Sequence, residues 1–409
     1  MSDPRFPKHF DGRRFYNPDA PQARSFSDVF RWKLTSRPEP SPGFISDVEQ
    51  SVPPRSIEGS ALQITLVNHS TVLIQQPGSN ILTDPIWSQR ASPVSWLGPK
   101  RRRKPGVRMD DLPDIDAVLI SHNHYDHLDL PTLRRLAARG DSKFIVPARV
   151  ASLLRLEKIG PAHEMDWGES LSLMGFTIHC VPALHFSSRK IYDRNKTLWC
   201  GYIIESQERL VYFAGDTAFG DHFSQVRNNF GAPDVALLPI GAYEPRWFMS
   251  PVHMAPEEAV QAHEILGAKT SIAIHHGTFQ LADDGIDTPL RRLMACRRDD
   301  SFLILKNGQF AEIPGLVSTH AWLDVSLSRT TTDHPRQKES QHCSARSSDA
   351  GENSCCVLLT APQSVLKGRL VANGYPHEFN RVTLRRLTTS VVDRRRADLP
   401  MPCKFLYYS

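Results

Sequence analysis

The chain has 409 residues, of which 40% are hydrophobic, 9% aromatic and 23% charged. This composition excludes a wholly disordered, collagen-like or coiled-coil chain, and the net charge of +5 is too small to indicate a nucleic-acid-binding protein. No stretch reaches the 18 or more consecutive apolar residues of a membrane-spanning helix, and the start has no apolar signal-peptide core. The sequence therefore predicts a soluble or peripheral protein.

The seven cysteines have no regular spacing, which argues against a disulfide framework and against a zinc site of the CxxC type. A reducing compartment is the simpler interpretation. We expect a protein that is cytoplasmic or peripheral to an intracellular membrane.

Elements follow in a clear order along the chain. Residues 1–54 are rich in Pro, Arg and Ser, with a short apolar patch at 26–32, and are expected to form an arm that packs on the core. Short β-branched runs predict strands at 62–67, 71–75, 81–85, 117–121, 143–147, 176–182, 198–205, 209–215, 234–240, 270–275 and 301–306. Helical spacing is present at 131–139, 149–157, 256–266 and 288–298, and Pro131, Pro256 and Pro289 suit first-turn positions in three of these segments.

Many strands with a few helices between them indicate an α/β protein of layered sheets covered by helices. We predict a catalytic domain over residues 55–315. Residues 316–409 carry four of the seven cysteines and several arginine clusters, and predict a poorly ordered tail.

The most informative segment contains four metal-ligand candidates within six residues: His122, His124, Asp126 and His127. It follows the apolar run 117–120. Alternation in an extended segment directs His122 and His124 to the same side, and the turn that follows can direct Asp126 and His127 to a neighbouring point. Imidazoles with carboxylates suit zinc, with manganese or iron(II) as alternatives.

Other candidate ligands stand at the ends of predicted strands. They are His185, Asp216 after Gly215, and the pair His275 and His276. The predicted assembly has His122, His124 and His185 on one metal, Asp126, His127 and either His275 or His276 on the second, and Asp216 shared between them. Asp84 is interpreted as a turn residue or as a carboxylate that orients a histidine.

This HxHxDH motif, followed by separate His, Asp and His strand ends, resembles the metallo-β-lactamase superfamily. The resemblance covers roughly residues 60–314 and implies a four-layer αββα sandwich with a dinuclear metal site at the sheet edge. Within the superfamily, the chain is most similar to the family of N-acyl-phosphatidylethanolamine-hydrolysing phospholipases D and their bacterial relatives. Residues 82–101, 111–129, 238–260 and IHHGTF at 274–279 carry that similarity.

The resemblance implies two zinc ions per chain, with Asp216 as the bridge and His275, rather than His276, as the second metal's ligand. It places Tyr125 and His253 beside the substrate phosphate. The chain differs from the family at two places. Residues 68–71 are Asn-His-Ser-Thr where Gly-His-Ala-Thr is common, and Phe186 stands where the lipase often has Trp.

The resemblance implies a phosphodiesterase of the phospholipase D type, which would release N-acylethanolamine and phosphatidic acid through a metal-bridging hydroxide. Asp126 and Asp216 are expected to serve as ligands and nearby bases, and His253 as a proton donor or oxygen-orienting group. The partner is then a phospholipid, with peripheral membrane association aided by the five consecutive cations at 100–104, although a solvated basic loop explains them equally well. A homodimer is left open.

Three other functions fit less well. A hydrolase of a lactone or another carbonyl compound is the first alternative, because the same chemistry can act on carbon and a fold does not determine its substrate. A nuclease of the RNase Z kind lacks support, since residues 60–315 contain no basic region interleaved with aromatics. A non-enzymatic scaffold is disfavoured by the complete set of seven ligands.

Overall fold

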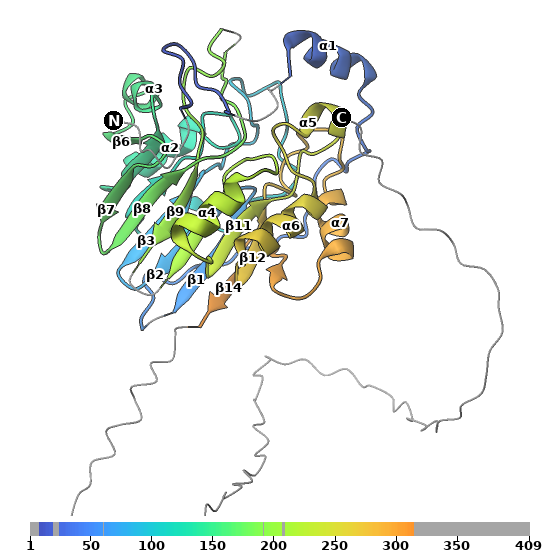
Figure 1. Ribbon diagram of the computed structural model, residues 1–409. Helices are drawn as coiled ribbons and strands as arrows, with labels where there is room; N and C mark the ends of the chain where they lie inside the picture. Colours follow the sequence, from blue (N-terminus) through green and yellow to red (C-terminus); the bar gives the residue numbers. More distant parts are fainter. Residues whose placement is uncertain (1–7, 19–23, 60, 191, 207–208, 315–409) are drawn as a thin grey trace, which may run out of the picture. The chain divides into compact units, whose positions relative to one another are not determined.

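Two seven-stranded sheets form the centre of the structure, a computed structural model that describes residues 8–18, 24–59, 61–190, 192–206 and 209–314 (Figure 1). The first sheet has, in order, the strands β14 (Phe310–Ile313), β1 (Leu62–Asn68), β2 (Thr71–Gln76), β3 (Ser79–Thr83), β4 (Ala117–Leu119), β5 (Lys143–Pro147) and β6 (Ala162–Met165). The second has β13 (Phe302–Leu303), β12 (Thr270–Ile274), β11 (Val235–Pro239), β10 (Leu210–Phe213), β9 (Gly201–Glu205), β8 (Phe176–Val181) and β7 (Ser170–Leu173). The predicted tail, 316–409, lies outside the described residues.

The main hydrophobic core lies between the two sheets. Leu66 and Ile74 of the first sheet share a buried cluster with Ile204, Phe213 and Leu237 of the second. Strands β1, β2 and β11 are buried along their whole length, as expected for strands covered on both faces. The sheets therefore pack face to face.

Helices cover the outer face of each sheet. The helices of the described residues are α1 (Phe26–Thr35), α2 (Leu130–Ala137), α3 (Ala151–Leu156), α4 (His222–Phe230), α5 (Arg246–Met249), α6 (Pro256–Leu266) and α7 (Thr288–Cys296), with a short 3-10 turn at Met109–Asp111. Of these, α1 and α5 do not lie on a sheet face but join a separate cluster through Trp32 and Met249. Leu133 and Leu154, from α2 and α3, pack on the first sheet, whereas Phe223 and Leu266, from α4 and α6, pack on the second. The four-layer αββα sandwich predicted from the sequence is confirmed.

Helix α6 shows how the sequence defines these elements. Pro256 occupies its first turn, the Glu258 carboxylate accepts a hydrogen bond from the Ala255 N–H at 2.7 Å, and Gly267 ends it in the left-handed conformation. Its bounds are those that the spacing predicted. In the part of the chain that the structure describes, no helix is both long and apolar enough to cross a membrane.

Parallel pairing determines where the functional loops gather. β3, β4 and β5 run parallel in the first sheet, and β10, β11 and β12 run parallel in the second. Neighbouring parallel strands end at the same edge of a sheet, so the loops after β4, β10 and β12 meet at one end of the sandwich. That end carries the HxHxDH motif, Asp216 and His275.

The N-terminal residues contact the core near the same end. Asn17 donates from Nδ2 to the His185 carbonyl at 2.8 Å and accepts from the Trp199 indole at 3.0 Å. Trp32 of α1 stacks on Phe248 with ring centroids 4.9 Å apart. Helix α1 begins with the apolar patch and continues beyond it to Thr35, and Ser25 caps its first turn.

The basic run 100–104 is built into the structure and is not a free cationic loop. Arg101 is 1% exposed, and its guanidinium donates to the Asn68 side chain and to the Ile86 carbonyl, each at 3.0 Å. Arg103 forms ion pairs with Asp47 and Asp287. Lys100 alone is classed as exposed in this run, so the expectation of five cations available to a membrane is wrong.

Candidate metal centre

The HxHxDH loop starts where β4 ends. Asp84 holds this start, because its carboxylate accepts hydrogen bonds from the Ser121 N–H at 2.7 Å and from the Ser121 hydroxyl at 2.6 Å. Asp216 reaches the same point from β10 because Gly215 precedes it: a Cβ at Gly215 would lie 2.7 Å from the Ser121 Cβ. Glycine at this position lets the two sheets approach where the ligands meet.

His122, His124 and His185 form a first set, the three-histidine group. His122 Nε2 lies 2.8 Å and His185 Nε2 lies 3.2 Å from His124 Nδ1. The His185 Nδ1–H donates to the Val252 carbonyl at 2.9 Å, which leaves the Nε2 lone pair directed at its neighbours. Burial lowers the pKa of His124 to about 3 and that of His185 to about 4, so these rings are neutral.

Asp126, His127 and His275 form a second set, the carboxylate group. Asp126 Oδ2 lies 3.2 Å from His127 Nε2 and 3.3 Å from His275 Nε2. Burial opposes protonation of these histidines, but the carboxylates of Asp216 and Asp126 outweigh it and raise the pKa of His275 to about 9. The same balance raises the pKa of His127 well above its usual value.

Asp216 lies between the two groups. Its Oδ2 is 3.1 Å from His127 Nε2 and 3.0 Å from His275 Nε2, and it also lies 3.9 Å from His122 Nε2 and 3.8 Å from His185 Nε2. A single carboxylate oxygen is therefore within 4 Å of histidines from both sets. The structure thus brings together all seven ligands that the sequence suggested.

These residues fit bound cations. In the three-histidine group, ring nitrogens of the buried His122 and His185 both face Nδ1 of the partly buried His124, which has at most one hydrogen to donate to the two of them. Asp216 Oδ1 is buried without a hydrogen-bond partner among the described residues. Imidazoles and carboxylates with inward lone pairs suit zinc and similar metals.

The two adjacent histidines at the end of β12 differ in direction. His275 has a left-handed backbone (φ 58°) that directs its ring to Asp126 and Asp216, whereas His276 Nε2 hydrogen-bonds the Ala273 carbonyl of its own strand at 3.2 Å. The geometry agrees with His275 as the ligand.

Tyr125 and His253 occupy different surroundings. The His253 ring centroid lies 5.0 Å from that of His185 and 5.3 Å from that of His275, beside both groups. The Tyr125 hydroxyl donates to the Arg189 carbonyl at 2.9 Å, and the Arg189 guanidinium lies 3.9 Å from the centre of the Tyr125 ring. His253 is thus next to the ligands, while Tyr125 packs against the loop that follows His185.

Two further residues belong to the centre. Asp84 Oδ2 accepts from His127 Nδ1 at 2.6 Å and takes the orienting place that the sequence indicated. His69, which the sequence did not single out, lies with its Nε2 3.1 Å from Asp126 Oδ2. The sequence feature that could have identified His69 is its position directly after a buried strand, which resembles the position of His275 after β12.

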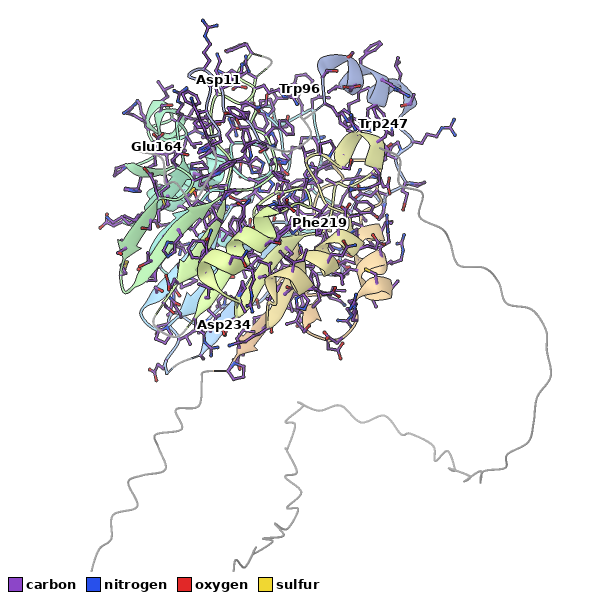
Figure 2. The ribbon with its side chains drawn as sticks, viewed as in Figure 1. Asp11, Trp96, Glu164, Phe219, Asp234 and Trp247 are labelled. Atoms are coloured by element: carbon purple, nitrogen blue, oxygen red, sulfur yellow. The ribbon has the colours of Figure 1, made fainter. Side chains whose placement is uncertain are left out.

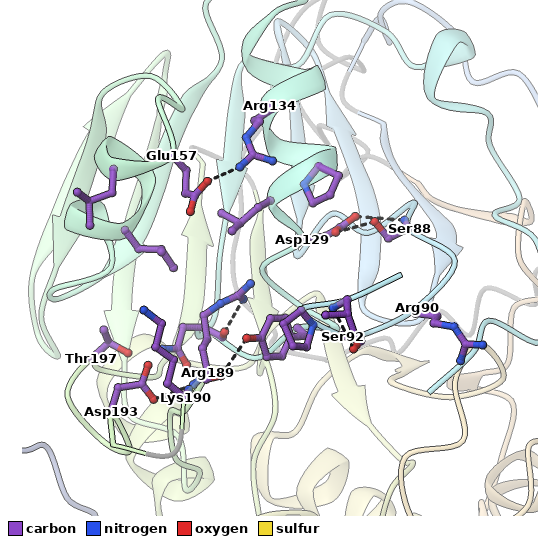
Figure 3. A pocket seen from close by; sticks show the side chains of 18 of the residues that line it. Ser88, Arg90, Ser92, Asp129, Arg134, Glu157, Arg189, Lys190, Asp193 and Thr197 are labelled. Carbon is purple, nitrogen blue, oxygen red and sulfur yellow. Dashed lines mark hydrogen bonds and ion pairs between the residues drawn. The ribbon is translucent and has the colours of Figure 1, made fainter. Parts of the chain in front are cut away.

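A cavity of about 750 Å³ begins beside the HxHxDH loop (Figure 3). Asn123 and Tyr125 of that loop form part of its wall, and Arg189 donates hydrogen bonds to the Asn123 and Leu128 carbonyls there. The wall combines apolar and charged side chains from four segments: Pro93, Val94, Leu130, Leu153, Leu156, Arg90, Arg149 and Lys190, with the carboxylates Asp129, Glu157 and Asp193. Its chemistry is amphipathic.

The fold and this set of ligands define a metal-dependent hydrolase of the metallo-β-lactamase type. The model of the Beta-lactamase superfamily domain matches residues 79–276. N-acyl-phosphatidylethanolamine-hydrolyzing phospholipase D 1 of Caenorhabditis elegans is 38% identical over 271 residues, which cover 62% of this chain and 76% of that protein. The chain therefore belongs to the β-lactamase superfamily and, within it, to the family of N-acyl-phosphatidylethanolamine-hydrolysing phospholipase D.

Two other similarities extend the picture. The UPF0173 metal-dependent hydrolase MK1542 of Methanopyrus kandleri is 28% identical over 254 residues, covering 61% of this chain and all of that protein. The crystal structure of an isothiocyanate hydrolase from Delia radicum gut bacteria matches with a TM-score of 0.52 and 20% identity, over 62% of this chain and 100% of that one. The latter likeness supports the fold alone.

Proposed function

We propose that the protein is a dinuclear zinc phosphodiesterase of the phospholipase D type, which hydrolyses N-acyl-phosphatidylethanolamine or a related phospholipid to N-acylethanolamine and phosphatidic acid. One observation carries the proposal. All seven candidate ligands converge in a chain that is 38% identical to a relative whose name states that activity.

His122, His124 and His185 would hold one cation, and Asp126, His127 and His275 the second, with Asp216 facing both. Two such ions supply Lewis-acid activation of water and of the phosphoryl oxygens. Hydrolysis joins the water oxygen to phosphorus, breaks the bond from phosphorus to the ethanolamine oxygen, and transfers a proton to that oxygen. Asp126 and Asp216 would be the nearby bases for the proton that water loses.

His253 supports a role at the phosphate. Its ring lies beside His185 and His275, and its Nδ1 is buried without a hydrogen-bond partner among the described residues. This nitrogen is therefore available to a phosphoryl or leaving oxygen within hydrogen-bond reach. Tyr125 would contribute from the cavity wall, where its ring is held by Arg189.

The cavity beside the HxHxDH loop favours a lipid over a compact lactone. Its volume of about 750 Å³ exceeds what a small ring needs, and Val94, Leu130, Leu153 and Leu156 give it an apolar lining suited to an acyl chain. Cations outnumber carboxylates at the same wall, where Asp129, Glu157 and Asp193 accompany Arg90, Arg134, Arg149, Arg189 and Lys190, and this excess supports an anionic headgroup.

A phospholipid surface is the proposed partner. Trp96 and Leu97 of the loop before the basic run are exposed, as are Phe30 and Leu34 of α1. Figure 2 shows Trp96 and Trp247 at the end of the molecule where α1 lies, and the Arg31 guanidinium lies 5.0 Å from the centre of the Trp247 ring. Exposed aromatic side chains with nearby cations are typical of proteins that rest on an interface.

The decisive experiment measures zinc content and then the release of N-acylethanolamine from vesicles of N-acyl-phosphatidylethanolamine. We expect about two zinc ions per chain and release that depends on them, with His275→Ala as the inactive control. Parallel assays use a chromogenic phosphodiester, a lactone and a β-lactam. Hydrolysis of the lactone without hydrolysis of either phosphodiester would refute the proposal and support the carbonyl hydrolase instead.

A further inference from the structure

His69 stands at the point where the two sheets join around the candidate metal centre. It follows β1, is 1% exposed, and has a left-handed backbone with φ 49°. Its N–H donates to the Thr278 hydroxyl at 3.0 Å, and its carbonyl accepts from the His275 N–H, also at 3.0 Å. A non-glycine residue in this conformation is strained and persists only when its surroundings impose it.

The ring of His69 contacts the carboxylate group at Asp126 and His275. His69 Nε2 lies 3.1 Å from Asp126 Oδ2, and the ring packs against His275 with centroids 4.3 Å apart. An ionised carboxylate can only accept, so the Nε2 of a neutral His69 carries the hydrogen that is donated to Asp126. Nδ1 has no hydrogen-bond partner among the described residues.

His69 differs from the predicted ligands in its contacts with Asp216. His127 and His275 each face both carboxylates, with distances of 3.0–3.3 Å to Asp126 Oδ2 and Asp216 Oδ2. Within the described residues, His69 Nε2 lies 3.1 Å from Asp126 Oδ2, and no contact with an Asp216 oxygen within 4 Å is present. His69 therefore shares Asp126 Oδ2 with His127 and His275 but, unlike them, has no contact with Asp216 among the described residues, which distinguishes it from the two predicted ligands.

We propose that His69 is a positioning residue of the carboxylate group, which holds Asp126 in its metal-binding orientation through an Nε2–H···Oδ2 hydrogen bond. Carboxylate ligands are commonly hydrogen-bonded by residues behind them, and loss of such a partner costs 10–100-fold in metal affinity or activity. This inference rests on the metal centre and not on the phospholipid substrate. A chain that binds two metals but hydrolyses another substrate would leave it intact.

The test measures zinc affinity of the full chain by competition with a chromogenic chelator. In His69→Ala, one zinc should bind about 10–100-fold more weakly while the other is unchanged. His69→Gln retains a donor of similar reach and should recover most of that affinity. His276→Gln is the matched control, because His276 is similarly buried and adjacent to a ligand but hydrogen-bonds its own strand.

The melting temperature of the metal-free protein distinguishes positioning from a general packing role. Positioning predicts that metal-free His69→Ala melts close to the metal-free His276→Gln control. Unchanged zinc affinity in His69→Ala would overturn the proposal. Complete loss of one zinc in both His69→Ala and His69→Gln would also overturn it, since His69 would then be a ligand itself.

Discussion

The two halves of the candidate metal centre are built on opposite electrostatic plans. The three-histidine group consists of imidazoles, and burial keeps the pKa of these rings low. The carboxylate group pairs His127 and His275 with Asp126 and Asp216, which raise the pKa of both histidines. The three-histidine group is thus a set of neutral imidazole ligands, whereas the carboxylate group is a set of buried ion pairs.

The difference teaches how each half is held in position. In the three-histidine group, the far nitrogen of His185 is fixed by the Val252 carbonyl and that of His122 contacts the Ser121 hydroxyl. In the carboxylate group, the far nitrogen of His127 hydrogen-bonds the Asp84 carboxylate, so a negative charge stabilises the histidine. A buried carboxylate left without its partner is costly, and the second half should be more sensitive to substitutions around it.

Asp216→Ala gives the largest expected effect, because it removes the carboxylate that both halves share. Loss of Lewis-acid chemistry worth several kcal/mol should lower hydrolysis by about 10³-fold or more. Zinc content measured after gel filtration should fall below one ion per chain. Retention of two tightly bound zinc ions would show that Asp216 does not join the halves.

His185→Ala and His275→Ala compare the halves directly. Each variant should lose one zinc ion and keep the other, with hydrolysis reduced by about 10²–10³-fold, since each ion contributes several kcal/mol. Metal analysis and the chromogenic phosphodiester assay measure this. Loss of both ions from either variant would mean that the two halves bind as one unit.

Asp84→Asn tests the charge that supports His127. The amide keeps the shape but not the negative charge at 2.6 Å from Nδ1, so zinc affinity of the carboxylate group should fall about 10–100-fold. The control is Asp129→Asn, another buried carboxylate, which hydrogen-bonds Ser88 and Thr132. Equal losses in both variants would assign the effect to general destabilisation.

His276→Ala should have the smallest effect. His276 directly follows His275 in sequence, but its ring hydrogen-bonds the Ala273 carbonyl. Hydrolysis should stay within about fivefold of the parent, a difference of roughly 1 kcal/mol. A loss as large as that of His275→Ala would reverse the assignment of the two histidines.

The layered fold and the convergence of the ligands could be predicted because both depend on short-range patterns. Strands β1 and β12 are buried apolar runs, and helix α6 has a proline at its start and a glycine at its end. The predicted strand 301–306 was too long: β13 lies at the sheet edge and pairs only at Phe302 and Leu303. Edge strands receive pairing from one side, which the sequence pattern does not report.

Features that depend on tertiary contacts were missed. Strand β14 and helix α4 have weak periodicity, and they form because β1 and the second sheet provide surfaces for them. Arg101 was read as a surface cation because a basic run gives no sign that one of its members inserts beside Asn68. His69 was missed because its role depends on Asp126, which lies 57 positions away in sequence.

The first and last strands of the sandwich are partners. β1 and β14 pair antiparallel, with Leu62 opposite Ile313, although the whole domain separates them in sequence. Leu62 lies at the end of β1 opposite to His69, a strand length of about 20 Å from the ligands. A circular permutant that joins these neighbouring ends and opens at another surface loop could thus keep every ligand on its own strand.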